Sequence, residues 1–126
     1  MAAKVLLSIK PEFVKLIASG VKRFEYRRVL YKRSDIKHIV VYASSPVCQI
    51  VGEIEVGDLL TDTPEALWGH TSAKAGISRE FFFSYFADRA KAHAIEIKSF
   101  HPYPSPLRLA DKYPSIVPPQ SFCYLY

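Results

Sequence analysis

The stretch 20–28, GVKRFEYRR, places several ionisable side chains directly after a glycine turn. Aromatic residues alternate with charged ones there, which is the side-chain period of a β-strand. On such a strand Glu25 and Arg27 project from the same face, and Lys22 lies close to that face at the turn. Arginine offers a planar fork that suits a phosphate or a base edge, and a lysine beside a carboxylate can donate a proton.

Two interpretations of this stretch stay open from its pattern. One is a solvated strand edge, whose exposed ion pairs contribute little to stability. The other is a polar cleft that holds a charged ligand, with Lys22 and Glu25 as candidate catalytic residues. In a hydrolase, Lys22 would be a general acid or a phosphate contact, and Glu25 would be a base that activates water. The pattern alone favours the solvated edge.

Hydroxyl groups lie at another expected strand end, in the sequence YASSPV. Ser44 and Ser45 follow an apolar run directly before a proline, where side chains can face a ligand. They could donate hydrogen bonds to a carbonyl or phosphate, or they could serve the local turn. Together with the nearby basic residues they complete the candidate ligand-binding set: Lys10, Lys22, Glu25, Arg27, Arg28, Ser44 and Ser45.

The composition is that of a moderately basic globular domain. The 126 residues are 49% hydrophobic and 23% charged, which fits one domain with its own core. The formal net charge is +5, and basic domains commonly meet nucleic acid. Aromatic residues reach 13%, more than a small core requires, so some rings could stack on a flat ligand.

Other classes of site and of cell location are disfavoured. The histidines are scattered and the two cysteines lack zinc spacing, so we expect no metal and no cofactor. Cys48 is expected to be a small core residue. The apolar run near the start is too short for a signal peptide or a membrane span, which predicts a cytoplasmic protein without a membrane partner. The oligomeric state is left open.

Hydrophobic periodicity predicts the elements that must position these side chains. Strands are expected within the charged stretch and at 4–9, 36–44, 49–60 and 92–100. Helices are expected at 11–20, at 65–70 and after Ser78. Strand pairs without helical crossovers favour an antiparallel or mixed sheet, curled into a small barrel with helices to one side. Residues 101–126 hold six of the nine prolines, and we expect a Pro-rich C-terminal extension packed on the barrel.

The charged stretch and its surroundings resemble the ASCH domain family, whose members share the pattern G-x-K-x-x-E-x-R. The pattern is complete here as Gly20, Lys22, Glu25 and Arg27. The similarity continues through VVYASSPVCQIVGEIEV, LWGHTSAKAGISREFFFSYF, AHAIEIKSF and PPQSF, and so covers nearly the whole chain. The resemblance implies an α+β fold: a PUA-like small mixed β-barrel of about five to six strands with three short flanking helices, forming a single ASCH/PUA-like domain over 1–126.

The resemblance also implies a function for the cleft. Family members are proposed to bind RNA or modified nucleotides; some bacterial members remove the acetyl group of N4-acetylcytidine, and another is a ribonuclease. The deacetylating members use a lysine that matches Lys22, but they carry a threonine where this chain has Glu25. They also need a glutamate in the segment that corresponds to 71–74, which holds none here. These differences favour the larger branch of the family, whose function is not established.

Three functions are therefore expected, and they are given in descending order of preference. The first is binding of nucleic acid, with RNA or a modified nucleotide as ligand, through the charged cleft. The second is a hydrolase on a nucleoside or RNA, amidohydrolase-like or ribonuclease, that uses Lys22. The third is a protein-interaction or regulatory domain that uses the Pro-rich tail. In the first case the cations Lys10, Lys22, Arg27 and Arg28 would contact phosphates, and a base edge would meet Glu25, Ser44 and Ser45.

Overall fold

The computed structural model describes residues 3–126, so Met1 and Ala2 of the expected domain lie outside the described residues. Six strands form one sheet, and they are β1 (Lys4–Ile9), β2 (Phe24–Arg27), β3 (His38–Ala43), β4 (Gln49–Asp62), β5 (Ala92–Leu107) and β6 (Phe122–Leu125). The helices are α1 (Pro11–Ala18), α2 (Pro64–Thr71), α3 (Arg79–Tyr85) and α4 (Leu109–Lys112), with a short 3-10 helix η1 (Ser72–Lys74) after α2.

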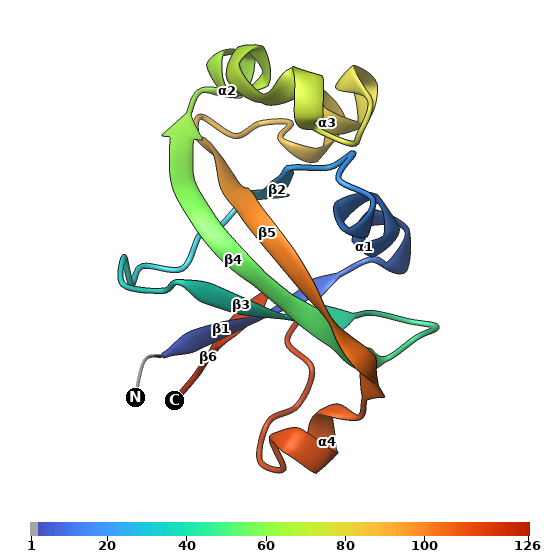
Figure 1. Ribbon diagram of the computed structural model, residues 1–126. Helices are drawn as coiled ribbons and strands as arrows, with labels where there is room; N and C mark the ends of the chain where they lie inside the picture. The colour runs from blue at the N-terminus through green and yellow to red at the C-terminus, as the bar shows by residue number, and fades with distance from the viewer. Residues whose placement is uncertain (1–2) are drawn as a thin grey trace.

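The sheet is mixed, with the strand order β2-β5-β4-β3-β1-β6. β1 and β3 run parallel, and the other neighbouring strands are antiparallel. β4 and β5 are the longest strands, and their pairing shifts register between Val56 and Leu59, which bends them. The sheet therefore curls into half of a barrel, with α1, α2 and α3 toward one end and α4 at the other (Figure 1). The α+β fold class predicted from the sequence is confirmed.

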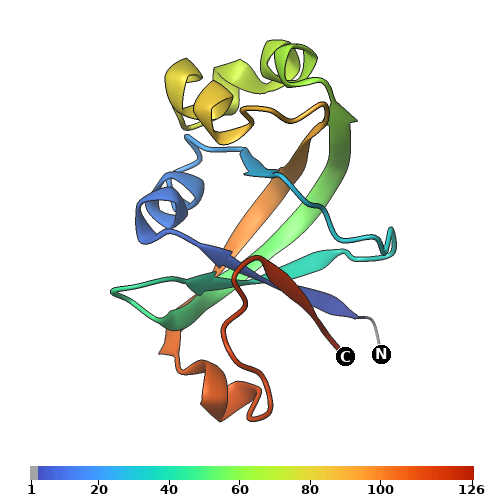
Figure 2. The ribbon, with the colours of Figure 1, turned by 180° about the vertical axis from the view of Figure 1, so that it is seen from behind.

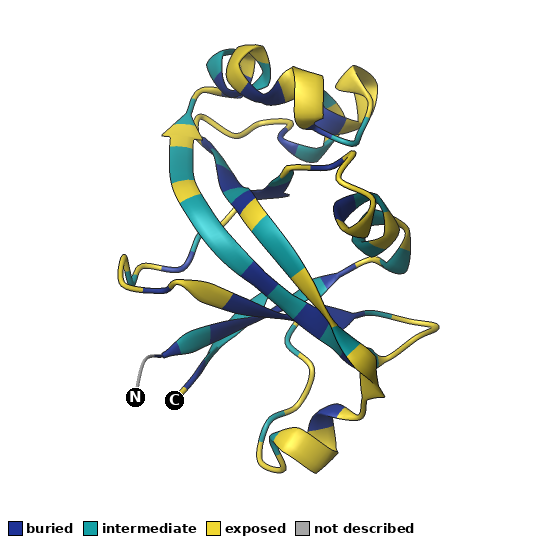
Figure 3. Ribbon diagram, viewed as in Figure 1, coloured by how far each residue is buried: buried dark blue, intermediate teal, exposed yellow. Residues whose placement is uncertain are grey.

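Two apolar clusters hold the flanking helices on the sheet. The larger one packs α1 against four strands, and its members include Val5, Leu7, Ile17, Ile39, Val41, Ile54, Ile95 and Ile97. The second gathers beneath α2 and α3, and its buried members are Tyr26, Leu67, Ala75, Phe82, Phe86, Ala92 and Ala94. Burial is concentrated where β4 and β5 cross the rest of the sheet, and α4 is mostly exposed (Figure 3).

The capping residues predicted from the sequence are present at the starts of α2 and α3 and at the end of α1. Thr63 caps α2 by accepting a hydrogen bond from the backbone of Ala66 at 3.3 Å, and Ser78 caps α3 in the same way, from Phe81 at 3.0 Å. These hydroxyls satisfy backbone N–H groups that have no partner inside the helix. Gly20 ends α1 in the left-handed conformation, at φ +82°, which glycine adopts without strain.

The C-terminal region 101–126 contains the end of β5, the helix α4 and the strand β6. Residues 101–107 continue β5, because they pair with β4. β2 pairs with β5 only at 93–96, so the other edge of β5 is open beyond them in the described chain. Prolines at alternate positions are tolerated on such an edge, where no ladder hydrogen bond needs their missing N–H. The chain then forms α4, which the sequence did not predict, and returns as β6 antiparallel to β1.

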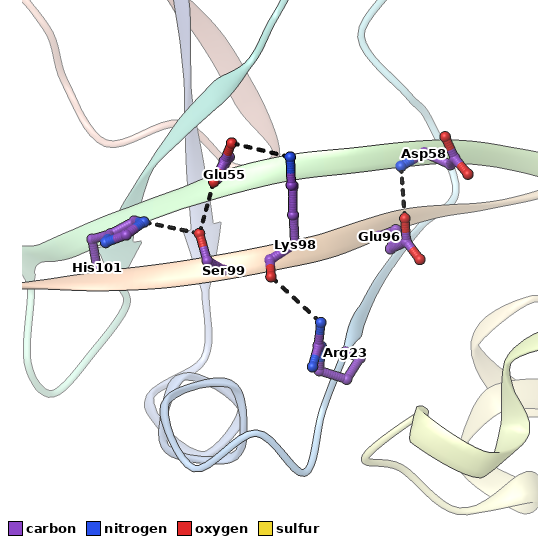
Figure 4. A network of polar contacts seen from close by, with 7 residues as sticks. All are labelled: Arg23, Glu55, Asp58, Glu96, Lys98, Ser99 and His101. Carbon is purple, nitrogen blue, oxygen red and sulfur yellow. Dashed lines mark hydrogen bonds and ion pairs between the residues drawn. The ribbon is translucent and has the colours of Figure 1, made fainter.

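Polar side chains form a network on β4 and β5 that extends to the entry of β2 (Figure 4). Glu55 accepts a hydrogen bond from Ser99 at 3.0 Å and pairs with Lys98 at 3.6 Å. Arg23 donates to the backbone oxygens of Ile97 and Lys98, at 3.1 and 3.4 Å. Arg23, which is itself exposed, therefore joins the start of β2 to β5 from outside. Within residues 3–126, no helix combines the length and the apolar character needed to cross a membrane.

Phe82 is the centre of the cluster beneath α2 and α3, and its replacement should be costly. It is fully buried, and its ring centroid lies within about 5 Å of four other rings: Tyr26 at 5.0 Å, Trp68 at 4.8 Å, Phe83 at 5.0 Å and Phe86 at 4.9 Å. We expect Phe82→Ala to lower the free energy of unfolding by about 3–5 kcal/mol, since it leaves a cavity. Urea denaturation measures this loss. The neighbouring Phe81, 42% exposed, is the matched control, and an equal loss in Phe81→Ala would contradict the assignment.

Candidate functional site

A pocket of about 850 Å³ opens between β2, α1, α3 and the segment that leads to β6. Its volume lies near the upper end of the range for small-molecule sites, about 300–1,000 Å³. Seen from behind, the segment before β6 reaches β1 close to the point where α1 begins (Figure 2). Side chains far apart in sequence therefore share one concave surface.

The structure brings together six of the seven residues predicted to bind a ligand. The residues that line the pocket are Lys10, Lys22, Glu25, Arg27, Arg28 and Ser44. Ser45 is exposed in the turn between β3 and β4 and does not line it. Cys48 ends this turn with φ +54° and is also exposed, so its expected place in the core is wrong. The turn carries both residues outward, because Val47 and Cys48 donate backbone hydrogen bonds to Ser44.

Lys22 lies inside the protein, with only 1% of its surface exposed. Its Nζ donates a hydrogen bond to the backbone oxygen of Ala75 at 2.9 Å. The same atom lies 4.8 Å from the ring centroid of Tyr26 and 5.3 Å from that of Phe13. Burial lowers the pKa of Lys22 below its usual 10.5; the charge of Glu25 opposes this effect and the charge of Arg27 adds to it. The interpretation as a solvated strand edge is therefore wrong for Lys22.

The close approach of a second loop explains how Lys22 becomes covered. Gly76 has φ +69°, and a Cβ atom at this position would lie 2.5 Å from the Cβ of Lys22. Only glycine lets the backbone come this near. Two backbone hydrogen bonds hold the lysine segment in place, from Lys22 to Leu16 at 3.0 Å and from Arg23 to Lys74 at 2.8 Å. The end of α1 and the loop after η1 thus enclose the lysine from two sides.

Glu25 and Arg27 form a second buried charged group beside Lys22. Their side chains pair at 3.3 Å, and Nη2 of Arg27 also donates to the backbone oxygen of Ser8 at 2.6 Å. Nε of Arg27 is buried without a hydrogen-bond partner among the described residues. Burying charges costs free energy even when they are paired, and such arrangements cluster at functional sites. The pair presents a donor and an acceptor side by side.

Tyr26 lies between these charges in sequence and supports them from the core side. Its hydroxyl donates to the Thr71 hydroxyl at 2.7 Å, and Thr71 in turn donates to the backbone oxygen of Leu67 at 2.8 Å. Burial raises the pKa of Tyr26 to about 12, so it is a neutral donor at physiological pH. Tyr26 is a buried member of the cluster beneath α2 and α3, and this hydrogen-bonded chain fixes the ring that faces Lys22.

The charge around the pocket is strongly positive. Five cations line it against one carboxylate, that of Glu25. Three of the cations are exposed and have no ion pair among residues 3–126: Lys10, Arg28 and Arg89. Ion pairs outside the pocket include Arg33–Asp35 and Arg108–Asp111, whereas other exposed cations, such as Lys15 and Arg79, have none in the described chain. No group of three or more His, Cys, Asp or Glu side chains in the described chain is arranged to hold a metal ion.

Part of the pocket wall was missed by sequence reasoning. The segment 118–122 lines it, because Ser8 donates through its hydroxyl to Pro119 at 2.6 Å and through its backbone to Ser121 at 3.3 Å. No local pattern indicates this contact, since the partners are more than a hundred residues apart; PPQSF stood out only through the family resemblance. Phe81 and Tyr85 also line the pocket, and neither was among the predicted ligand-binding residues.

The chain is similar to known proteins over the region that forms this pocket. The pattern of the ASCH domain matches residues 7–102. A Zymomonas mobilis subsp. mobilis protein named ASCH domain-containing ribonuclease is 29% identical over 124 residues, which are 97% of this chain and 84% of that protein. The crystal structure of ASCH from Zymomonas mobilis superposes with a TM-score of 0.85 at 29% identity, over 98% of this chain and 87% of that one. Large ribosomal subunit protein uL22 of Ureaplasma parvum serovar 3 is 24% identical over 96% of this chain but only 39% of its own length.

The lowered pKa of Lys22 predicts how stability depends on pH. Between that lowered value and 10.5 the unfolded chain holds the lysine proton more tightly than the folded one, so the stability of the protein rises with pH. Lys22→Met removes the buried charge, so the variant should have a higher free energy of unfolding than wild type. This difference should be largest at neutral pH and should shrink as the pH rises toward 10.

Urea denaturation of both proteins from pH 7 to pH 10 measures this difference. Lys15→Met, which changes an exposed lysine of α1 outside the pocket, is the matched control and should show no such trend. A difference between Lys22→Met and wild type that is flat, or that grows with pH, would show that the buried ammonium does not disfavour the folded state.

Proposed function

This chain belongs to the ASCH domain family, and from that premise we propose that it binds RNA in the pocket between β2, α1 and α3. The observation that supports the proposal best is the buried group Lys22, Glu25 and Arg27, set in a pocket whose cations outnumber its acids. A phosphodiester supplies the negative charge that this surface attracts. Few other ligands combine such charge with a flat, hydrogen-bonding ring.

In this proposal, different residues of the pocket contact the phosphates and the base of the RNA. Lys10 and Arg28 are exposed at the mouth and contact phosphate oxygens. Glu25 and Arg27 are buried and offer an acceptor beside a donor, which suits the edge of an unpaired base. The ring of Phe13 gives such a base an apolar surface. A base in a duplex has its edge occupied, so the proposed ligand is single-stranded.

The relatives support RNA as the class of ligand. The Zymomonas mobilis protein that aligns with 97% of this chain is named a ribonuclease.

The tail packs against β1 and contributes to the pocket wall, so the same segment that was considered for protein interaction has a role in the proposed RNA site.

A second candidate function is hydrolysis of RNA at the same site. The observation that favours it is the lowered pKa of Lys22 next to Glu25, because an acid or base works best when its pKa lies nearer the working pH. In this candidate Glu25 takes the proton of the attacking hydroxyl or water. Lys22 stabilises the charge on the phosphate or gives its proton to the leaving oxygen. The name of the Zymomonas mobilis relative points the same way.

RNA binding should depend strongly on salt. We expect the logarithm of the affinity for labelled single-stranded RNA to fall linearly with the logarithm of the salt concentration, with a slope of about 0.7 per phosphate contact. Lys10→Gln should reduce the slope by about 0.7, since it removes one exposed cation without touching the core. Arg108→Gln, an exposed and paired cation outside the pocket, is the control. Absence of binding at low salt would overturn the proposal.

Catalysis is tested with variants that keep the pocket but change its chemistry. If the chain hydrolyses RNA, Lys22→Met should lower the cleavage rate about 10²-fold or more, the usual effect of losing an acid–base group, while Lys15→Met keeps it. Cleavage of labelled RNA is followed by electrophoresis, and release of acetate from N4-acetylcytidine is followed in parallel. Equal rates in Lys22→Met and wild type would exclude Lys22 from catalysis, whichever substrate is turned over.

A further inference from the structure

We propose that the pocket receives a strand rather than an isolated nucleotide. One nucleotide lies against the buried residues, and the next lies on a neighbouring surface that we name the α3 rim: Arg28, Phe81, Tyr85 and Arg89. This inference rests on the proposed function, RNA binding, and adds to it a second subsite and a minimum length of ligand.

The pocket has two ends of different character, which is the first reason. At one end Lys22, Glu25 and Arg27 are all at least nine-tenths buried. At the other end Phe81 is 42% exposed and Arg89 is also exposed, although both line the same pocket. A volume of about 850 Å³ near the upper limit for small-molecule sites leaves room beyond one base and its sugar.

The aromatic side chains of the rim are the second reason. Phe81 and Tyr85 are one helical turn apart in α3, so they lie on the same face of the helix. Phe81 packs edge-on against Phe13, with ring centroids 5.7 Å apart, and it is 42% exposed and lines the pocket. An exposed ring beside cations is the surface on which proteins stack unpaired bases. The fully buried rings of the same segment are Phe82 and Phe86, whereas Tyr85 is only partly buried against that cluster and Phe81 is exposed.

The cations of the rim are the third reason. Nε of Arg28 donates to the backbone oxygen of Tyr85 at 2.7 Å, and its guanidinium lies 4.3 Å from the centroid of the Tyr85 ring. This contact fixes the guanidinium between β2 and α3 and leaves its other nitrogens for a phosphate. Arg89 adds a second cation at the same edge. Glu80 and Asp88, the acids of this segment, do not line the pocket, so the rim stays positive.

The pocket wall formed by 118–122 indicates the direction in which the bound strand runs. The wall formed by 118–122 has no charged side chain, and it offers the polar Gln120 and Ser121 instead. A second phosphate is therefore attracted toward α3 and not toward the tail. Cations and rings occur together along the α3 rim, and a single strand presents phosphates and bases together.

The test compares ligands of increasing length at low salt. Affinities of wild type are measured for a nucleoside monophosphate, a dinucleotide and a hexanucleotide of single-stranded RNA. We expect the dinucleotide to bind more tightly than the monophosphate. Phe81→Leu, which keeps the apolar packing but removes the ring, should weaken dinucleotide binding roughly fivefold or more and leave monophosphate binding unchanged. Arg89→Gln should act in the same direction, and its effect should fade as salt is raised.

The matched control is Arg79→Gln, because Arg79 is an exposed arginine at the start of α3 that does not line the pocket. It should leave all affinities unchanged. Equal affinity of wild type for monophosphate and dinucleotide would overturn the second subsite while leaving the proposed function intact. Loss of monophosphate binding in Phe81→Leu would overturn it too, since the rim would then belong to the first nucleotide. If no ligand of any length binds, the proposed function itself fails.

Discussion

The buried ammonium group of Lys22 is the constraint on which the arrangement of the pocket depends. A charge in the interior persists only where oxygen atoms, rings and opposite charges replace the water that it loses. Here the backbone oxygen of Ala75 accepts its hydrogen bond, the rings of Tyr26 and Phe13 face it, and Glu25 opposes its charge. These groups come from the loop after η1, from β2 and from α1, so the pocket forms only when all three have docked.

This arrangement reduces the stability of the protein, and the neighbouring core offsets the reduction. The Glu25–Arg27 pair is buried as well, with one donor of Arg27 left without a partner in the described chain. Next to it the rings around Phe82 form a closely packed cluster that anchors α3. Tyr26 belongs to both groups, because its ring packs against the ring of Phe82 and also faces the ammonium group of Lys22. The charged site is thus held rigid by an apolar cluster.

The short helix α3 serves the core and the pocket at once. Its faces differ because residues three and four apart share a side of a helix. Phe82 and Phe86 point into the core, and Phe81 and Tyr85 line the pocket. The aromatic richness of the chain therefore has two uses. Rings in the core position the strand that carries the charges, and rings at the pocket present an apolar surface to whatever those charges attract.

Local features of this protein follow from the residue types of short segments. Hydroxyl caps, a terminal glycine and alternation around Glu25 depend on near neighbours, so the helix starts and the common face of Glu25 and Arg27 could be predicted. The burial of Lys22 could not be predicted in this way, because its partner Ala75 lies 53 residues away and meets it only in the folded chain. The same reason explains why the tail's place in the pocket wall was missed: β6 pairs with β1 from the other end of the chain. Residue types and spacing report local preference, whereas burial is set by segments that meet only when the chain has folded.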